Sequence, residues 1–442
     1  MNQPGFTKEY IQKSTELLEY AVKNLGAYKA WQAFDPGPGH GIAERYAALP
    51  VITKKEIREN FPLGFVPPDK DVEKGIADGE ICFVKTSGSS DAFRVTNIWN
   101  QPWWDASEVA SWQLNSYAAR LATGNHPEAI LVNARNVGIV SDEVDLPMEK
   151  RRLDRFLYLN EKTDPTAWTP RLMDRMIEEL ELFKPVLLEA NASFLARLCR
   201  YITENNKKVY QPGLIVFTYE FPSRLSYRQV GKVFKCPAIS SYGSTETGYV
   251  LMQCEAGKLH QNTESCRLDF QPLKPEHGGP YIGRMLVTTL DNPWYYMLRF
   301  DVGDFARLDE AQTCPCGRKD GWIISEVEGR WTNVTLDTAG RIVTMNQLDK
   351  AVSAIDNLDE YRLEQPAEGV YKLFLVSKRK GRAALIKEAE AVLHKVYGRK
   401  AKTEIVFETT LAPEDSGKYA LAKTLFPMKN IEEYLDTAPA IR

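Results

Sequence analysis

Short apolar runs alternate with longer helical patterns between about residues 80 and 245. The apolar runs predict strands at residues 81–85, 129–133, 186–189, 214–218 and 238–242, with helices such as 171–182 and 193–203 between them. Repeated strand and helix units of this kind are typical of a largely parallel sheet. Because ligands bind at the carboxyl ends of parallel strands, the loops after Lys85 and Ser241 are the first places to look for a site.

The pattern changes beyond residue 250. Strand-like runs at 285–290 and 299–308 and a Cys-Pro-Cys-Gly turn at 314–317 predict a β-rich subdomain over about 250–329, which ends near Gly329 and Arg330. A strand at 371–376, a helix at 383–397 and a strand at 403–408 predict a separate α+β unit. We therefore expect an α/β protein with mostly parallel sheets in a large domain, 1–329, and a small mobile α+β domain, 330–442.

Composition narrows the class of protein. Hydrophobic residues make up 43% of the 442 residues and charged residues 26%, which is typical of a globular protein and excludes disorder. The net charge of −3 predicts neither nucleic acid nor membrane as a partner. The first residues are amphipathic with no apolar export signal, and no apolar run is long enough to span a bilayer, so we expect a cytoplasmic monomer or homodimer.

Three polar segments could carry chemistry. Thr86-Ser87-Gly88-Ser89-Ser90 surrounds a glycine with hydroxyls after a strand, as in an anion cradle, although a solvated turn fits its composition equally well. Tyr242-Gly243-Ser244-Thr245-Glu246 offers an aromatic face, hydroxyls and a carboxylate that could stack a base, contact phosphate and hold Mg²⁺, or it is a plain loop. Asp304, in the segment 298–304, could accept both hydroxyls of a ribose or be a turn residue. A P-loop kinase is disfavoured because the Walker lysine is missing.

In this order and spacing, the three segments resemble the core motifs of the adenylate-forming superfamily, which includes acyl-CoA synthetases, adenylation domains and luciferases. Gly329-Arg330 resembles the hinge motif of that superfamily, and Ser416-Gly417-Lys418 resembles the loop that carries its catalytic lysine. The phenylacetate-CoA ligase branch is similar in two further segments, Leu259-His260 and the Cys-Pro-Cys-Gly-Arg stretch at 314–318.

The resemblance implies an ATP-dependent enzyme that activates a carboxylic acid as an acyl adenylate, releases pyrophosphate and passes the acyl group to CoA. ATP, Mg²⁺ and CoA are the expected cofactors and co-substrates, and Lys418, Glu246 and Thr245 the expected catalytic residues, with Glu246 on Mg²⁺. The nucleotide would be bound by Thr86, Ser87, Gly88, Ser89, Ser90, Tyr242, Gly243, Ser244, Asp304 and Arg330. The acyl pocket would include Trp112, Asn133, Tyr219, Glu220 and Phe221.

The aromatic residues near this pocket favour an aromatic acid, although a plain aromatic core would look the same. Two alternatives remain open. An amine could intercept the adenylate, which would make the protein an amide-forming ligase. A non-catalytic nucleotide-binding regulatory protein would keep the fold without turnover.

Four residues form a candidate zinc set, Cys254, His260, Cys314 and Cys316, and Cys266 could replace one of them. Four nitrogen and sulfur ligands suit a structural tetrahedral site, but buried thiols without metal explain the pattern as well. The chain has only seven cysteines, which is an odd number and a small one for 442 residues. A fold held together by disulfide bonds is therefore not expected.

Overall fold

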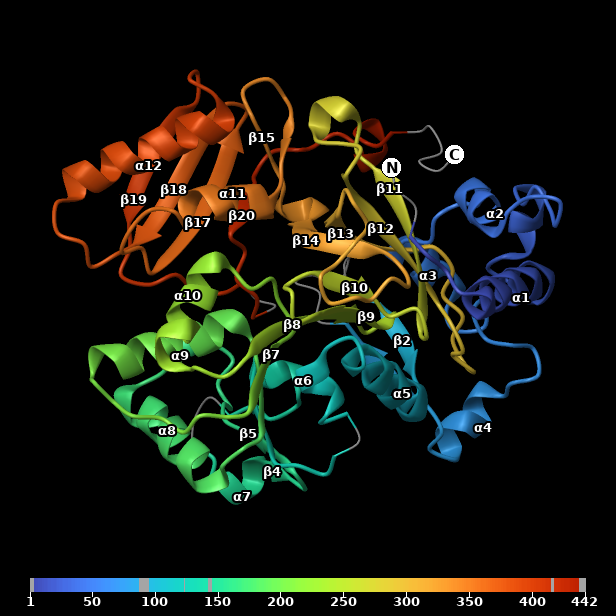
Figure 1. Cartoon of the computed structure of the whole chain (residues 1–442), viewed down its shortest axis with the longest axis horizontal. Coiled ribbons are helices and arrows are strands. Elements are labelled where there is room, and N and C mark those ends of the chain that lie inside the picture. Colours follow the sequence, from blue (N-terminus) through green and yellow to red (C-terminus); the bar gives the residue numbers. More distant parts are fainter. Residues whose placement is uncertain (1–3, 87–94, 123, 142–144, 415–416, 437–442) are drawn as a thin grey trace. The chain divides into compact units, whose positions relative to one another are not determined.

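The computed structural model describes residues 4–86, 95–122, 124–141, 145–414 and 417–436. The chain forms two compact units, each assembled from separate stretches of sequence (Figure 1). Unit 1 contains Met1–Thr123, Ser241–Val327 and Ile431–Arg442, and unit 2 contains Gly124–Ser240 and Glu328–Asn430. The boundaries of these two units differ from the expected domain boundary at residue 329. The division into a large domain, 1–329, and a small mobile domain, 330–442, stays a prediction.

Unit 1 is built around antiparallel strands. The strands are β8 (Ala238–Ser244), β9 (Gly248–Gln253), β10 (Leu259–Gln261), β11 (Cys266–Pro272), β12 (Ile282–Thr289), β13 (Phe300–Leu308) and β14 (Ile323–Arg330). Their order in the sheet is β11-β12-β13-β14-β10-β9-β8. The first residues of β8 and the last residues of β14 belong to unit 2. Its helices are α1 (Lys8–Asn24), α2 (Ile42–Ala48), α3 (Lys54–Asn60), α4 (Val72–Ala77), α5 (Gln101–Trp112) and α6 (Ser116–Ala119), with short 3-10 turns η1 (Lys29–Ala33), η4 (Pro275–His277) and η6 (Ile431–Glu433). Buried side chains such as Leu18, Val250 and Met285 form its core. The β-rich region expected after residue 250 is confirmed.

The strand expected at 81–85 forms as β1 (Cys82–Lys85) but lies outside the parallel sheet. It pairs antiparallel with β2 (Thr96–Trp99) in a separate two-stranded sheet. The connection between the two strands is too short for a crossover helix, and parallel pairing requires such a crossover.

Unit 2 contains the parallel part of the fold. Strands β5 (Phe156–Tyr158), β3 (Glu128–Leu131), β6 (Leu187–Ala190), β7 (Leu214–Phe217) and the first residues of β8 run parallel in that order, with β4 (Arg152–Leu153) antiparallel at the edge. The connecting segments are α7 (Met148–Arg151), α8 (Pro170–Phe183), α9 (Ala192–Glu204) and α10 (Arg224–Val233), with η2 (Ala134–Asn136) and η3 (Pro165–Ala167). Leu131, Leu188 and Ile215 come from three neighbouring strands, β3, β6 and β7. They share one hydrophobic core with Phe194 and Leu198 of α9. The expected strand and helix repeat is confirmed here.

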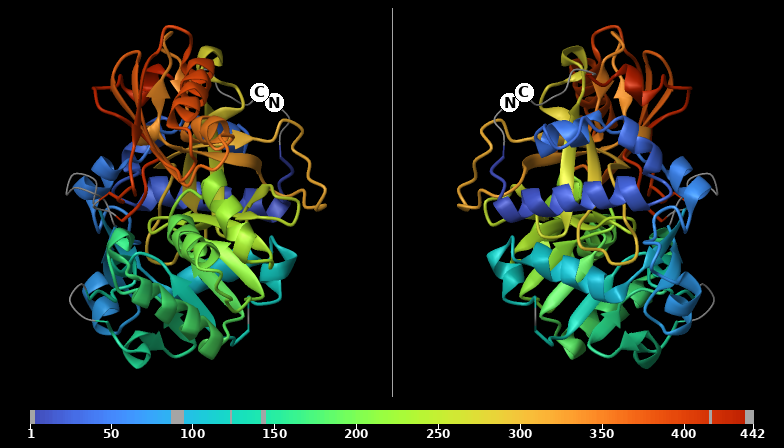
Figure 2. Two further views of the ribbon diagram at one scale, coloured as in Figure 1. Left: turned by 90° about the vertical axis from the view of Figure 1, so that its left-hand side faces the viewer. Right: turned by 90° about the vertical axis from the view of Figure 1, so that its right-hand side faces the viewer.

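The same unit holds a second, four-stranded sheet. Its order is β19-β18-β17-β20, and α12 covers one face of it (Figures 1 and 2). The elements of this region are η5 (Trp331–Asn333), β15 (Thr335–Leu336), β16 (Ile342–Val343), α11 (Met345–Val352), β17 (Glu360–Ala367), β18 (Val370–Val376), α12 (Arg382–Tyr397), β19 (Lys402–Phe407) and β20 (Ala422–Thr424). Leu225 of α10 joins the core of this region.

The last described residues return to unit 1 and pair with its edge. Leu435 forms a bridge with Leu273, directly after β11. The backbone N–H of Lys274 donates to Tyr434 at 2.9 Å, and the N–H of Asp436 donates to Pro272 at 2.9 Å. Tyr434 and Leu435 are both buried, so this segment is a packed part of unit 1.

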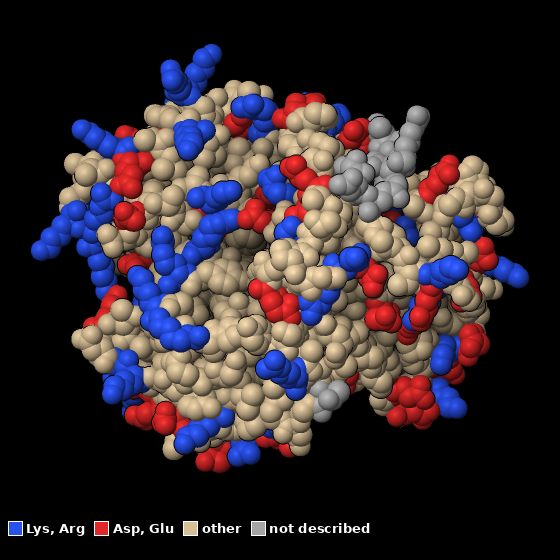
Figure 3. Space-filling model, in the orientation of Figure 1, with Lys and Arg blue, Asp and Glu red and all other residues tan. Residues whose placement is uncertain are grey.

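Basic and acidic side chains are interspersed over the face of the protein shown in Figure 3. None of the helices in the described part of the chain is both long enough and apolar enough to cross a bilayer.

Candidate functional site

Two of the three predicted nucleotide segments meet in unit 1. The Tyr242 hydroxyl, at the end of β8, donates a hydrogen bond to Asp304 Oδ2 on β13 at 2.9 Å. Asp304 is buried, whereas the Tyr242 side chain is half-buried. At Gly243 a Cβ atom would lie 2.3 Å from the carbonyl oxygen of Gly248, so only glycine allows β8 and β9 to approach this closely. An aromatic ring from β8 and a buried carboxylate from β13 are thus held together by a hydrogen bond.

Glu246 follows in the turn between β8 and β9. Its side chain is buried, and its Oε1 atom lies 3.5 Å from Lys54 Nζ, at the start of α3. Among the described residues, nothing donates a hydrogen bond to this oxygen. A buried carboxylate oxygen without a donor is unusual, and it suits a group that binds a cation.

Tyr295 is a second buried residue of unit 1 whose side-chain oxygen has no hydrogen-bond partner among the described residues. Burial raises the pKa of Tyr295, and Tyr28 and the charge of Glu246 raise it further. The hydroxyl therefore stays protonated and is able to donate a hydrogen bond.

The remaining nucleotide residues are only partly described. Thr86 is buried and accepts a hydrogen bond from the N–H of Val95 at 3.1 Å, which closes the base of the β1–β2 hairpin. Ser244 and Thr247 share a hydrogen bond of 2.9 Å across the turn that contains half-buried Thr245. Ser87, Gly88, Ser89 and Ser90 lie outside the described residues.

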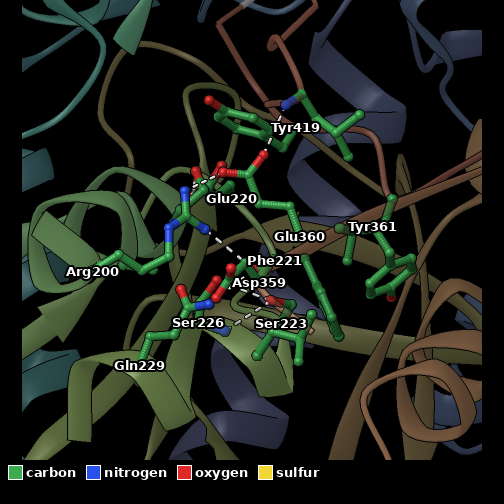
Figure 4. Close-up of a pocket in the computed structure, with 15 residues that line it drawn as sticks. Arg200, Glu220, Phe221, Ser223, Ser226, Gln229, Asp359, Glu360, Tyr361 and Tyr419 are labelled. Atoms are coloured by element: carbon green, nitrogen blue, oxygen red, sulfur yellow. Dashed lines mark hydrogen bonds and ion pairs between the residues drawn. The ribbon is translucent and has the colours of Figure 1, made fainter. Parts of the chain in front are cut away.

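Lys418 lies in unit 2, next to Tyr419, which lines a small cavity (Figure 4). The cavity measures about 50 Å³ and is lined by α9, the loop after β7, the start of β17 and residues 411, 419 and 421. Glu220 accepts hydrogen bonds there from Ser193, at 2.6 Å from the backbone N and 2.5 Å from Oγ.

The segment around Lys418 is tied to this cavity. The backbone N–H of Tyr419 donates to the Glu220 carboxylate, as Figure 4 shows. Burial raises the pKa of Glu220, whereas the hydrogen bonds from Ser193, the charge of Lys418 and the N–H of Tyr419 oppose the rise. Gly417 has a φ of +77°, and a Cβ atom there would lie 1.7 Å from Asn133 Nδ2, so no larger residue fits.

The residues expected to line the acyl pocket fall in both units. Trp112 is buried at the end of α5 in unit 1. In unit 2, Asn133 donates to the carbonyl of Thr163 at 2.9 Å, and Tyr219 has a φ of +68° in the turn that leads to Glu220 and Phe221. Arg330, the expected hinge residue, is exposed at the end of β14. Their roles stay predictions.

The four candidate zinc ligands converge in unit 1. The ligand atoms of Cys254, His260, Cys314 and Cys316 all lie within 4.8 Å of one another. The two closest pairs are Cys254 Sγ with Cys314 Sγ, at 3.6 Å, and Cys316 Sγ with His260 Nε2, at 3.3 Å. Gly317, at φ +84°, closes the turn that brings both cysteines of the Cys-Pro-Cys-Gly segment to the cluster. Burial lowers the pKa of His260 to about 4, assisted by the charge of Arg318, so its imidazole is neutral.

Sequence reasoning did not find three residues of these sites, Lys54, Tyr295 and Ser193. Lys54 reads as an ordinary first residue of a helix after a Thr cap, and Ser193 as a polar residue near a helix start. Neither carries a local signal, because the residues they contact are far away in the sequence.

No model of a protein family matches the chain. Among solved structures, it superposes on 2-hydroxyisobutyryl-CoA ligase in the post-adenylation state with a TM-score of 0.68 and 16% identity, over 97% of this chain and 90% of that one. The chain has the fold of the adenylate-forming ligases. The anthranilate-CoA ligase AuaEII, in complex with anthranoyl-AMP, gives a TM-score of 0.51 and 13% identity over 92% of this chain and 78% of that one.

A curated relative is Protein CapK of Staphylococcus aureus. It is 26% identical over 199 residues, which are 42% of this chain and 43% of CapK. The chain therefore matches less than half of the length of this relative.

Proposed function

We propose that this protein activates a carboxylic acid with ATP, releases pyrophosphate to form an acyl adenylate, and then transfers the acyl group to CoA. The observation that carries the proposal is the 2.9 Å hydrogen bond between Tyr242 and buried Asp304, with the unsatisfied carboxylate of Glu246 following four residues after Tyr242. An aromatic face for a base, a carboxylate for a ribose and a second carboxylate for a cation are the groups that ATP requires. The fold shared with adenylate-forming ligases supports the same conclusion.

The chemistry needs no general base, because the attacking carboxylate is already a nucleophile. The barrier comes from charge repulsion at the α-phosphate and from the departing pyrophosphate, so catalysis is mainly electrostatic. In this proposal the Tyr242 ring contacts the adenine, Asp304 accepts the ribose hydroxyls, and Arg330 assists in binding the nucleotide. Thr86, Ser87, Gly88, Ser89, Ser90, Gly243 and Ser244 surround the phosphates.

Glu246 would hold Mg²⁺, since its Oε1 atom is buried and receives no hydrogen bond from the described residues. When bound, Mg²⁺ neutralises charge on the phosphate oxygens. Thr245 is proposed to contact the phosphates from the same turn, and Lys418 is proposed as the catalytic lysine that stabilises the charge developing on the α-phosphate.

The aromatic residues at the expected acyl segments, Trp112, Tyr219 and Phe221, support an aromatic acid and a phenylacetate-CoA ligase-like protein, and Asn133 belongs to the same expected set. CoA is the first choice of acceptor, and an amine is the alternative. We further propose a structural Zn²⁺ on Cys254, His260, Cys314 and Cys316, because four nitrogen and sulfur atoms lie within 4.8 Å of one another, as in a tetrahedral site.

The test is exchange of labelled pyrophosphate into ATP, measured with Mg²⁺ and a panel of aromatic and aliphatic acids but without an acceptor. Exchange that depends on the acid supports adenylation and names the substrate class. Adding CoA or an amine to the active mixture then identifies the acceptor by its stimulation of AMP release. ATP binding without exchange across the panel would contradict the proposal and favour a regulatory nucleotide-binding protein.

A further inference from the structure

We propose that Glu220 is a positioning residue that holds the segment carrying Lys418 in place for adenylation, rather than a residue that contacts the acid. The inference rests on the function proposed above, because it assumes that Lys418 acts in the first half-reaction. It concerns only residues of unit 2, all of which lie around the cavity in Figure 4 or next to it.

The carboxylate of Glu220 joins two parts of the unit. On one side it accepts both hydrogen bonds of Ser193, in the first turn of α9, at 2.6 and 2.5 Å. On the other side it accepts the backbone N–H of Tyr419, the residue directly after Lys418. With Ser193 and Tyr419 as donors, the Glu220 carboxylate is fully engaged in holding protein groups, which leaves it poorly placed to bind a substrate.

The residues on both sides of Lys418 are fixed. Tyr419 is held by Glu220 through its backbone, and its ring meets the edge of Phe194 with centroids 6.4 Å apart at 88°. On the other side, Gly417 packs so closely against Asn133 that a Cβ atom would clash. The backbone on both sides of Lys418 is therefore held by contacts with other parts of unit 2.

A second carboxylate fixes the start of the same segment. Glu360 accepts the backbone N–H of Leu411 at 2.8 Å and pairs with Arg200 of α9. The carboxylates of Glu220 and Glu360 thus bind backbone N–H groups at the two ends of residues 411–419. These two contacts tie both described ends of the segment to other parts of unit 2.

Glu220→Gln tests the inference with almost no change in volume. The amide has one acceptor oxygen, so it cannot serve Ser193 and Tyr419 together, and its NH₂ group would face a donor. We expect kcat of pyrophosphate exchange to fall by about 10- to 100-fold with little change in the KM of the acid, because displacing a catalytic group by about 1 Å can cost that much. Transfer to CoA from chemically made acyl adenylate is expected to change less than about 2-fold.

The matched control is Glu388→Gln, which removes a carboxylate from a pair with Arg379 in the same unit. This variant is expected to retain both half-reactions. A melting temperature of Glu220→Gln close to that of the wild type would show that the fold is intact.

A measurement without turnover separates this inference from the proposed function. The labelling rate of Lys418 by an amine-reactive reagent is followed by mass spectrometry, with exposed Lys395 on α12 as internal reference. Glu220→Gln is expected to raise the ratio of Lys418 to Lys395 labelling at least about 3-fold, whether or not the wild type exchanges pyrophosphate. An unchanged ratio, an equal loss of both half-reactions, or a higher KM for the acid at unchanged kcat would overturn the positioning role.

Discussion

At the scale of single residues, Tyr242 and Asp304 form a contact that can be weakened without removing the aromatic ring. Tyr242→Phe leaves the ring for the adenine but removes the donor at 2.9 Å from Asp304. We expect the KM for ATP to rise by about 5- to 10-fold, since a protein hydrogen bond makes a net contribution of about 1 kcal/mol. Steady-state kinetics at saturating acid measures this effect.

Tyr201→Phe is the control for this variant. Tyr201 donates to Asp174 at the same distance of 2.9 Å, on helices of unit 2. It is expected to leave the KM for ATP unchanged. Equal kinetics in the two variants would mean that the hydroxyl of Tyr242 does not help to bind the nucleotide.

The sequence predicts the contacts of some site residues but not of others. Tyr242, Glu246 and Asp304 were expected from a shared motif pattern, and the structure brings Tyr242 and Asp304 into contact. Lys54 could not be expected, because its 3.5 Å approach to Glu246 depends on the packing of α3 and not on any neighbouring residue. A contact of this kind exists only once the tertiary structure has formed.

At the scale of elements, the strands and turns that bring Cys254, His260, Cys314 and Cys316 together lead to a prediction about the zinc content of the protein. The purified protein is expected to contain about one zinc per chain by mass spectrometry of the elements. Cys314→Ser and Cys316→Ser are each expected to lose it, because a three-ligand remnant binds zinc more weakly. Removal of zinc by a chelator is expected to lower the melting temperature, since metal affinity is linked to folding.

Cys82→Ser serves as the matched control, as Cys82 is an exposed thiol on β1. It is expected to keep its zinc and its melting temperature. Protein that is free of zinc after purification without chelators would contradict the proposed site and leave the cluster as four packed side chains.

Elements also show where sequence patterns succeed and fail. The repeat of buried strands and amphipathic helices in β3 to β8 was predicted correctly, because each strand is covered by helices and reads as a continuous apolar run. The same kind of run in β1 gives a hairpin strand instead. Apolar composition identifies a strand but not its partner, which the length of the next connection decides.

At the scale of the whole molecule, the returning C-terminal segment contributes to the stability of unit 1. Leu435 is fully buried where it pairs with Leu273. Leu435→Ala is expected to lower the free energy of unfolding by about 2 to 4 kcal/mol, the usual cost of truncating a buried leucine. Urea unfolding followed by tryptophan fluorescence measures the change.

Leu182→Ala is the comparison, because Leu182 on α8 is 75% exposed. Its free energy of unfolding is expected to stay within about 0.5 kcal/mol of the wild type. Similar values for the two variants would show that the final segment does not add to the stability of the fold.

The return of the chain at Ile431 has a mechanical consequence. Residues 328–430 leave unit 1 at Val327 and re-enter it at Ile431, so they are covalently attached at both ends. A pendant domain can swivel about a single joint, but a stretch secured twice has to adjust its backbone at both joints at once. A single break of the backbone at either of these two junctions would therefore leave residues 328–430 covalently attached to unit 1 through the other one.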